Sequence, residues 1–360
     1  MTLIQRYLLT TFGRLTMLAL SAFSGIYLLV DFFEKVDDFL EHQAAPAFYL
    51  SYFLCKIPLI ISQVLPLSVL LGTFLTLGSL SKSHELTAMR AGGIGLARVV
   101  LPLCVATLLL CVSHFGINEY LLPSSLQKAN HILRVEVKGK SESLGKRQNL
   151  WFRDASTINH IRLALPEAGR LHGITLYQIN AANQLTVRFD ADKAFFENNA
   201  WVANQAVIRE FNPSTGQLLD EKRFNRISIP LNKTPHDFAV TNGKSDELNF
   251  RLLKELSDRL RREGLDATRY LVDMHSRLAA PLASLVMFLL AIPFALQKSR
   301  NINLALGISI SVLIGVSFFV VQSTLMALGY SAILPPGIAA WSANLIFLLL
   351  GLFLILSTRD

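Results

Sequence analysis

Five uncharged and strongly apolar stretches constrain this chain more than any other feature of its sequence. They cover residues 15–30, 57–81, 99–118, 278–297 and 301–358. A helix of about 20 mostly apolar residues crosses the hydrocarbon core of a bilayer, which is roughly 30 Å thick. The stretches therefore predict a membrane protein. The mean hydropathy of +0.42 and the charged fraction of only 17% exclude an ordinary water-soluble domain of this length.

The stretches predict six membrane-spanning helices. The first extends to a helix over residues 7–33, because only Arg14 interrupts the apolar sequence there. The last is too long for one helix, and turn-forming residues at 329–331 and 335–337 divide it into two. We interpret the first helix as a retained span rather than a cleaved signal peptide, because further apolar sequence follows its small residues. Three spans precede a polar middle region and three follow it.

The sequence of the polar middle region predicts an inserted all-β domain. Residues 123–275 hold 23 of the 34 Lys and Arg residues and 18 of the 26 Asp and Glu residues. From residue 149 onwards, short runs rich in β-branched and aromatic residues alternate with turn-forming segments, which predicts a sandwich, a jelly roll or an open barrel. We assign residues 1–122 to spans one to three and 123–245 to a jelly-roll-like domain. Residues 246–275 are assigned to an amphipathic connecting helix and 276–360 to spans four to six.

The charges of the short loops predict the orientation in the membrane, because Lys and Arg accumulate on the cytoplasmic side. With the N-terminus inside, the inner segments carry a set of basic residues: Arg6, Arg14, Lys82, Arg90, Arg98, Lys298, Arg300 and Arg359. The outer loop 34–51 is acidic, with four acidic residues and Lys35 near its start. The sequence therefore predicts cytoplasmic termini and an external β domain.

No catalytic constellation stands out, so we do not expect an enzyme. Residues 139–141 and 243–245 both read Gly-Lys-Ser, the end of a phosphate-binding loop, but neither has the glycine that such a loop carries five residues earlier. Metal motifs of paired cysteines or of His-Glu-x-x-His are also missing from the sequence. The net charge of +8 is spread out, which argues against nucleic acid as a partner.

The inner loop between spans two and three is the first candidate functional segment. Its residues Glu85, Leu86, Met89 and Arg90 have the spacing of a short helix that ends at Gly92-Gly93. A short amphipathic helix on the inner face suits docking to a cytosolic motor protein. A simple connector at the membrane interface would have the same pattern.

Basic residues near the predicted outer ends of the spans are the second candidate site. They are Lys35, Lys56, Lys128, Arg134 and Arg277. Lying at a similar depth, they could surround a phosphorylated lipid headgroup. For each side chain taken alone, snorkelling of the charge to the membrane surface is the alternative explanation.

Several segments, taken in order, resemble the LptF/LptG (YjgP/YjgQ) family, the membrane permeases of the lipopolysaccharide export system. The resemblance covers essentially the whole chain and is carried by the three-plus-three arrangement of spans and by seven segments: Ser83–Gly93, Leu150–Asp154, Leu171–Tyr177, Phe195–Trp201, Arg269-Tyr270, His275–Arg277 and Pro281–Ala283. The end of span one, Leu29–Lys35, is more similar to the LptG branch of the family than to the LptF branch.

The resemblance implies a function and a set of partners. It implies a multi-pass protein of the Gram-negative inner membrane that extracts lipopolysaccharide and passes it to a periplasmic bridge. An LptF-type permease would be the heterodimer partner, an LptB dimer would hydrolyse ATP, and LptC with an LptA-type bridge would receive the lipid. No cofactor is expected on this chain itself. Glu85 matches the coupling-helix acid of the family, and Lys35 lies where LptG has basic residues near lipid phosphates, although Glu34 beside it departs from that pattern.

Other functions remain as alternatives at this point. A permease subunit could transmit ATPase work to another periplasmic target, such as lipoprotein release or cell-wall enzyme control. An ion-coupled secondary transporter needs polar residues deep within its spans, and we find little there beyond Gln63, His114 and Gln322. A membrane-anchored binding domain would not need six spans.

Overall fold

The structure, a computed structural model, forms two compact units, which we describe separately. It describes residues 3–42, 45–138, 147–154, 156–166, 168–180, 182–197, 199–231, 233–235, 238, 245–262, 266–296 and 304–357. The helical unit comprises residues 1–139, 245–254 and 268–360, and the β unit comprises residues 140–244 and 255–267. The division separates the apolar flanks of the chain from most of its polar middle.

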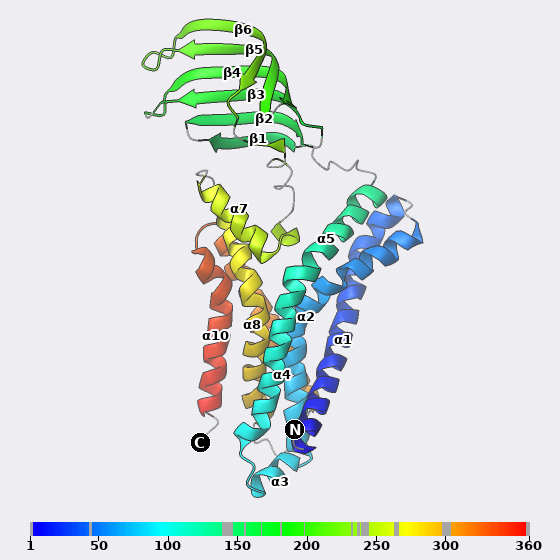
Figure 1. The fold of residues 1–360 in the computed structure, drawn as a ribbon. Coiled ribbons are helices and arrows are strands. Elements are labelled where there is room, and N and C mark those ends of the chain that lie inside the picture. The colour runs from blue at the N-terminus through cyan, green and yellow to red at the C-terminus, as the bar shows by residue number, and fades with distance from the viewer. Residues whose placement is uncertain are drawn as a thin grey trace. The chain divides into compact units, whose positions relative to one another are not determined.

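Six helices of the described residues are long and apolar enough to cross a membrane, which confirms the predicted number and the three-plus-three arrangement (Figure 1). They are α1 (Leu3–Glu41), α2 (Pro46–Lys82), α4 (Leu96–Gly116) with its extension, α8 (Thr268–Leu296), α9 (Leu304–Tyr330) and α10 (Pro336–Ser357). The extension of α4 consists of a π-helical turn (Ile117–Leu121), α5 (Leu122–His131) and a second π-helical segment (Ile132–Val137). A short helix, α3 (Glu85–Ala91), joins α2 to α4.

The boundary expected at residue 122 is not a structural boundary. The third span continues as a helix to Val137, and the first strand begins only at Arg147. Polar residues enter the sequence at this point, but Leu122, Leu126 and Ala129 keep a helical spacing and are buried. The change in composition therefore marks the end of the helix's fully apolar surface and not the end of the helix.

The connecting segment also differs from the single helix expected over residues 246–275. It begins with a 3-10 turn (Ser245–Glu247), continues as α7 (Phe250–Arg262), and α8 already starts at Thr268. Residues 263–265 lie outside the described part of the chain. The leucines at positions 248, 252, 253, 256 and 260 that suggested an amphipathic helix lie in α7 or just before it.

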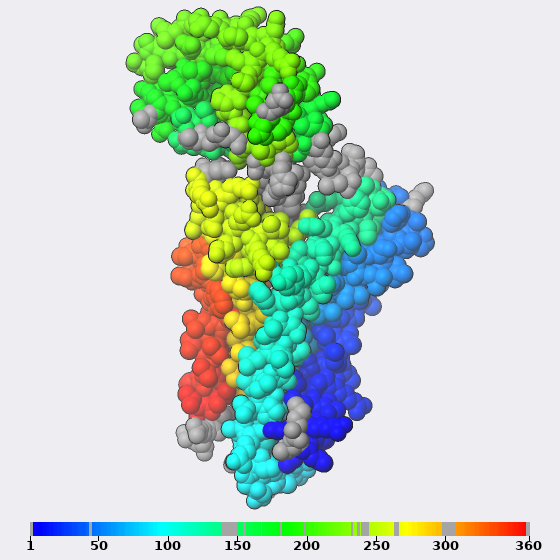
Figure 2. Space-filling model, in the orientation of Figure 1, coloured from blue at the N-terminus to red at the C-terminus, as the bar shows by residue number. Residues whose placement is uncertain are grey.

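Two helices form the centre of the helical unit. In its most apolar window α8 is 67% buried and α2 is 44% buried, against 17% for both α1 and α9. Helices α1 and α2 pack closely where a glycine lies at their contact. A Cβ atom added at Gly72 of α2 would lie 2.2 Å from Thr16 Oγ1 of α1, which is too close for a side chain at that position. The outer helices expose apolar side chains, and α4 forms part of the surface that Figure 2 shows. This distribution suits a bundle whose periphery faces lipid.

The β unit contains one six-stranded antiparallel sheet whose strands follow one another in chain order. They are β1 (Arg147–Asp154), β2 (Thr157–Leu165), β3 (Arg170–Ile179), β4 (Leu185–Glu197), β5 (Ala200–Phe211) and β6 (Leu218–Ile229). β4 is the longest of these strands and continues without a break from Leu185 to Glu197. The all-β prediction is confirmed, and the described strands form a meander without the crossovers of a true jelly roll.

A bend across the sheet explains how one meander encloses a core. Along a flat strand, buried side chains recur at every second residue. Four strands instead contain a step of three between neighbouring buried residues: Ile161 to Ala164, Leu171 to Ile174, Ala191 to Ala194 and Ala203 to Ala206. The register places these steps side by side, and Gly173 has a φ of +63° there. The sheet therefore folds along one line, and both halves pack against a core that includes the fully buried Trp201.

Candidate functional site

The short helix α3 lies where the sequence predicted it, and local turn geometry sets both of its ends. His84, directly before α3, has a left-handed backbone with a φ of +59°, so the chain turns sharply out of α2. After the helix, Gly93 has a φ of +82°, a conformation that glycine adopts without strain. The loop between the second and third spans is therefore a defined helical projection at one end of the helical unit (Figure 1).

The four residues predicted to face a motor protein divide into two groups. Leu86 is buried, and Met89 is partly buried against the same apolar core, so both hold α3 to the bundle. Arg90 is exposed. Glu85 is partly exposed and accepts a hydrogen bond of 2.9 Å from the Ser83 hydroxyl. In this chain the surface offered by α3 therefore carries Glu85 and Arg90, whereas Leu86 fixes the position of the helix.

Two of the predicted headgroup residues lie together at the α1–α2 junction, each with a carboxylate. The Lys35 ammonium is 3.0 Å from Glu34. The Lys56 ammonium is 2.5 Å from Asp31 and lies over the Tyr52 ring, 5.2 Å from its centroid. The side chains of Lys56 and Asp31 are only 14% and 7% exposed. Lys56 is thus neutralised within the bundle, whereas Lys35 lies nearer the surface.

The other three basic residues have different surroundings. The Arg277 guanidinium donates a hydrogen bond of 2.7 Å to the Asp246 carbonyl oxygen. Lys128 on α5 and Arg134 on the following π-helical segment are exposed, and the described residues provide no charged partner for either. The structure therefore brings together Lys35 and Lys56, but it does not arrange all five side chains in one ring.

Polar side chains of the second and third spans form hydrogen bonds with one another. The Ser62 hydroxyl donates to Asn118 Oδ1 at 2.7 Å and lies 2.8 Å from His114 Nε2. Because a hydroxyl has one proton, Ser62 can only accept from His114, so Nε2 carries the ring proton. His114 is fully buried. These contacts fit a histidine that joins the second and third spans.

A buried carboxylate ties the third span to the start of α7. Glu119, in the first π-helical turn, is 5% exposed and accepts a hydrogen bond of 2.9 Å from the Phe250 backbone N–H. Further along, on α5, Asn130 donates a hydrogen bond of 2.7 Å to the Glu247 carboxylate. An ionised carboxylate at a helix N-terminus is favourable because free N–H groups point towards it. The segment that leads back into the membrane is therefore held by the extended third span.

Sequence reasoning missed Asp31 and Glu119 as structural residues. Asp31 directly follows the uncharged stretch 15–30 and Glu119 directly follows the stretch 99–118, positions at which a charge is ordinarily solvated at the membrane surface. Both are instead buried. The only signal available was that Asp31 and Lys56 each border a long uncharged run, and such charges usually have partners.

The described residues provide no evident metal centre: no three His, Cys, Asp or Glu side chains among them lie close enough to hold an ion. The Gly-Lys-Ser segment at 139–141 and residues 243 and 244 of the second one lie outside the part of the chain that the structure describes. The structure instead offers three candidate functional features: the exposed helix α3, basic side chains at the opposite end of the helical unit, and the inserted β unit.

Comparison with known proteins identifies the family. The model of the family "Lipopolysaccharide export system permease LptF/LptG" matches residues 6–357, which is nearly the whole chain. This chain belongs to the LptF/LptG family. The resemblance found in the sequence is thereby confirmed, and with it the general class of an export permease.

Relatives within the LptF/LptG family carry the LptG name. The chain is 26% identical to the lipopolysaccharide export system permease protein LptG of Escherichia coli K12 over 344 residues, which covers 95% of this chain and 94% of that protein. It is 23% identical to the LptG protein of Haemophilus influenzae over 308 residues, or 84% of each chain. Both matches agree with the greater similarity of span one to the LptG branch.

Proposed function

We propose that this chain is the LptG-type permease subunit of an ABC transporter that extracts lipopolysaccharide from the outer leaflet of the inner membrane. An LptF-type permease completes the membrane channel, and an LptB-type ATPase dimer docks on the cytoplasmic side. LptC and an LptA-type bridge receive the lipid. The observation that carries the proposal is the family match over residues 6–357, together with six spans arranged around an inserted β unit.

Extraction of such a lipid requires a source of energy outside this chain. Exposing acyl chains to water costs about 0.8 kcal/mol per CH₂ group, so lifting several chains out of a bilayer is strongly unfavourable. The sequence contains no complete phosphate-binding loop. We therefore assign ATP hydrolysis to the partner subunit and mechanical coupling to α3, with Glu85 and Arg90 as the contacts.

The orientation that we propose places α3 and both termini in the cytoplasm and the β unit in the periplasm. The basic inner loops and the acidic outer loop support it. The same orientation brings Lys35, Lys128 and Arg134 to the periplasmic side, where their exposed or partly exposed charges attract lipid phosphates. Lys56 and Arg277 are bound to partners within the helical unit, so we assign them a structural role beside the headgroup site.

The test reverses the charge at Glu85. Like charges brought together at an interface cost several kcal/mol, so we expect Glu85→Arg to reduce ATP-driven lipid release from proteoliposomes by at least about tenfold, the equivalent of 1.4 kcal/mol. The ATPase should also copurify poorly with this variant. Arg98→Glu, an exposed charge reversal outside α3, is the matched control. Wild-type copurification and release in the Glu85→Arg protein would contradict the docking role.

A further inference from the structure

One face of the β sheet presents a row of aromatic and basic side chains to solvent. We call it the outer platform, and it consists of Trp151, His160, Tyr177, Arg188, Arg209 and Arg223. The strand register pairs Trp151 with His160, Tyr177 with Arg188, and Arg188 with Arg209, which places these side chains on the same side of the sheet. Neighbouring residues in the strands, such as Phe152, Leu176 and Phe189, point to the opposite side and are buried in the core.

The aromatic part of the outer platform is flat and accessible. The Trp151 indole stacks on the His160 ring with centroids 4.3 Å apart, and it is nearly parallel to the Tyr177 ring, with 4° between the planes. Trp151 remains 56% exposed. Stacking on a cross-strand neighbour stabilises the sheet, but it does not require an indole whose other face is open to water.

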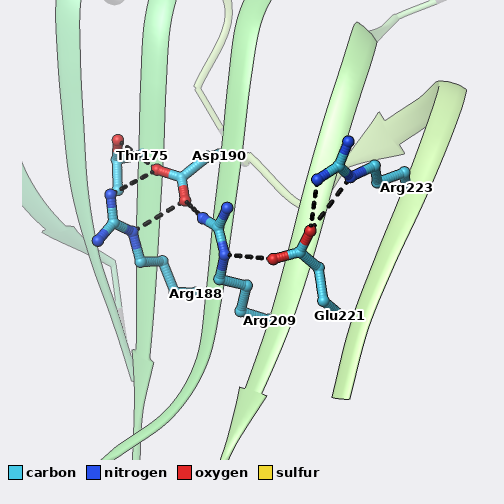
Figure 3. Close-up of polar contacts among 6 residues, drawn as sticks. All are labelled: Thr175, Arg188, Asp190, Arg209, Glu221 and Arg223. Atoms are coloured by element: carbon cyan, nitrogen blue, oxygen red, sulfur yellow. Dashed lines mark hydrogen bonds and ion pairs between the residues drawn. The ribbon is translucent and has the colours of Figure 1, made fainter. Parts of the chain in front are cut away.

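The basic part of the outer platform is ordered by two carboxylates, as Figure 3 shows. Asp190 accepts hydrogen bonds from Arg188 Nη2 at 3.0 Å and from Arg209 Nη1 at 2.7 Å. Glu221 accepts from Arg209 at 2.9 Å and from Arg223 at 2.9 Å. Three guanidinium groups therefore share two carboxylates, and the cluster keeps one net positive charge.

The remaining hydrogen-bonding capacity of these arginines faces outwards. Each guanidinium has five N–H donors. The Arg223 side chain is 79% exposed and that of Arg188 is 40% exposed. The Arg188 guanidinium also lies 5.6 Å from the centroid of the Tyr177 ring, which joins the basic part to the aromatic part. Donors held in fixed positions lose little entropy on binding an anion.

We propose that the outer platform binds an anionic saccharide, a sugar carrying phosphate or carboxylate groups. The apolar face of a sugar ring lies on the exposed part of the Trp151 indole, and the anionic group takes hydrogen bonds from Arg188, whose guanidinium lies over the neighbouring Tyr177 ring. The excess positive charge and the fixed donors match an anion, while the single open indole suits one small ring. This inference rests on the proposed function, because it assigns the platform to the sugar part of the exported glycolipid.

The test measures saccharide binding to the full-length protein in its permease complex in nanodiscs. The probe is a deacylated, phosphorylated oligosaccharide from lipopolysaccharide, and the same oligosaccharide after phosphatase treatment is the comparison ligand. We expect Trp151→Ala to weaken binding of both ligands by about tenfold. Arg188→Gln should weaken binding of the phosphorylated ligand alone. Leu219→Ala, which removes another exposed side chain of the sheet, is the matched control and should bind as the wild type does.

Three outcomes would overturn the inference. The first is unchanged affinity in both platform variants, and the second is equal binding of the two ligands by the wild type. The third is loss of a copurifying protein in Trp151→Ala with saccharide binding intact, which would make the platform a protein interface. Arg188→Gln keeps the test informative if Trp151→Ala fails to fold. A wild type that releases lipid but binds no saccharide refutes the platform alone, whereas one that binds saccharide but releases no lipid refutes the proposed function.

Discussion

Replacing Asp31 by Ala is expected to destabilise the helical unit by about 3–5 kcal/mol, because it leaves Lys56 charged inside the bundle without its counter-ion. The two side chains are 7% and 14% exposed, and their charged atoms are 2.5 Å apart. At an effective dielectric constant of about 20, charges at this distance attract by roughly 7 kcal/mol. Desolvation of the two ions costs several kcal/mol each, so the intact pair is close to break-even. The expected loss of stability therefore comes from leaving the Lys56 ammonium buried without a counter-ion.

The double variant separates this explanation from a simple loss of packing. Asp31→Asn with Lys56→Met removes both charges at similar volume, and we expect its stability to lie within about 1.5 kcal/mol of the wild type. Glu34→Ala is the matched control, because its partner Lys35 is at the surface and exposed pairs contribute about 0–1 kcal/mol.

The assay is unfolding of the purified full-length protein in mixed micelles with increasing sodium dodecyl sulfate, followed by circular dichroism. Single and double variants form a double-mutant cycle that gives the coupling energy between the two side chains. A coupling energy below about 1 kcal/mol, or an Asp31→Ala protein as stable as the Glu34→Ala control, would refute the reasoning.

Two further predictions concern helix packing and pH. A Cβ at Gly72 would lie 2.2 Å from Thr16 Oγ1 and 2.8 Å from its Cα, so Gly72→Val should cost at least about 1–3 kcal/mol in the same assay, whereas Gly13→Val, with no atom within 4 Å, should not. An equal loss in both variants would contradict this. In the β unit, hydrogen bonds from Arg223 and a second arginine hold the pKa of Glu221 below its ordinary value of 4.5. Because the pKa of this carboxyl is lower in the folded than in the unfolded protein, its ionisation stabilises the folded state at pH values above the unfolded-state pKa. This contribution to the free energy of unfolding is lost as the pH falls through the folded-state pKa. Thermal unfolding should therefore show a deficit for Glu221→Gln at pH 7 that shrinks as the pH falls below 4.5; a deficit independent of pH would count against the ion pairs.

Features that depend on a short length of chain could be predicted from the sequence. The six spans follow from runs of apolar residues, since the bilayer thickness fixes the length that a helix needs. Helix α3 follows from the spacing of Leu86 and Met89 and from the glycines after them. The β character of the inserted unit follows from short β-rich runs between turns. Even here the ends were uncertain, because the third span continues to Val137 where its composition has already become polar.

Contacts between distant parts of the chain could not be read from local patterns. The bend of the sheet arises because steps of three in the buried pattern of four strands fall on one line, and only the register aligns them. The same register assembles the outer platform from strands that are scattered along the sequence. Alternation within a single strand gives no information about which side chains become neighbours across the sheet.

The amino-acid sequence by itself determined that this chain is a six-span membrane protein with an inserted β unit, since hydrophobic length and periodicity act locally. Only the tertiary structure decided which charges are available for function. Lys56 is neutralised by a carboxylate 25 residues earlier, and Glu119 holds a backbone N–H 131 residues later. The physical reason is that the free energy of a charge depends on its burial and on its partners, and folding creates both.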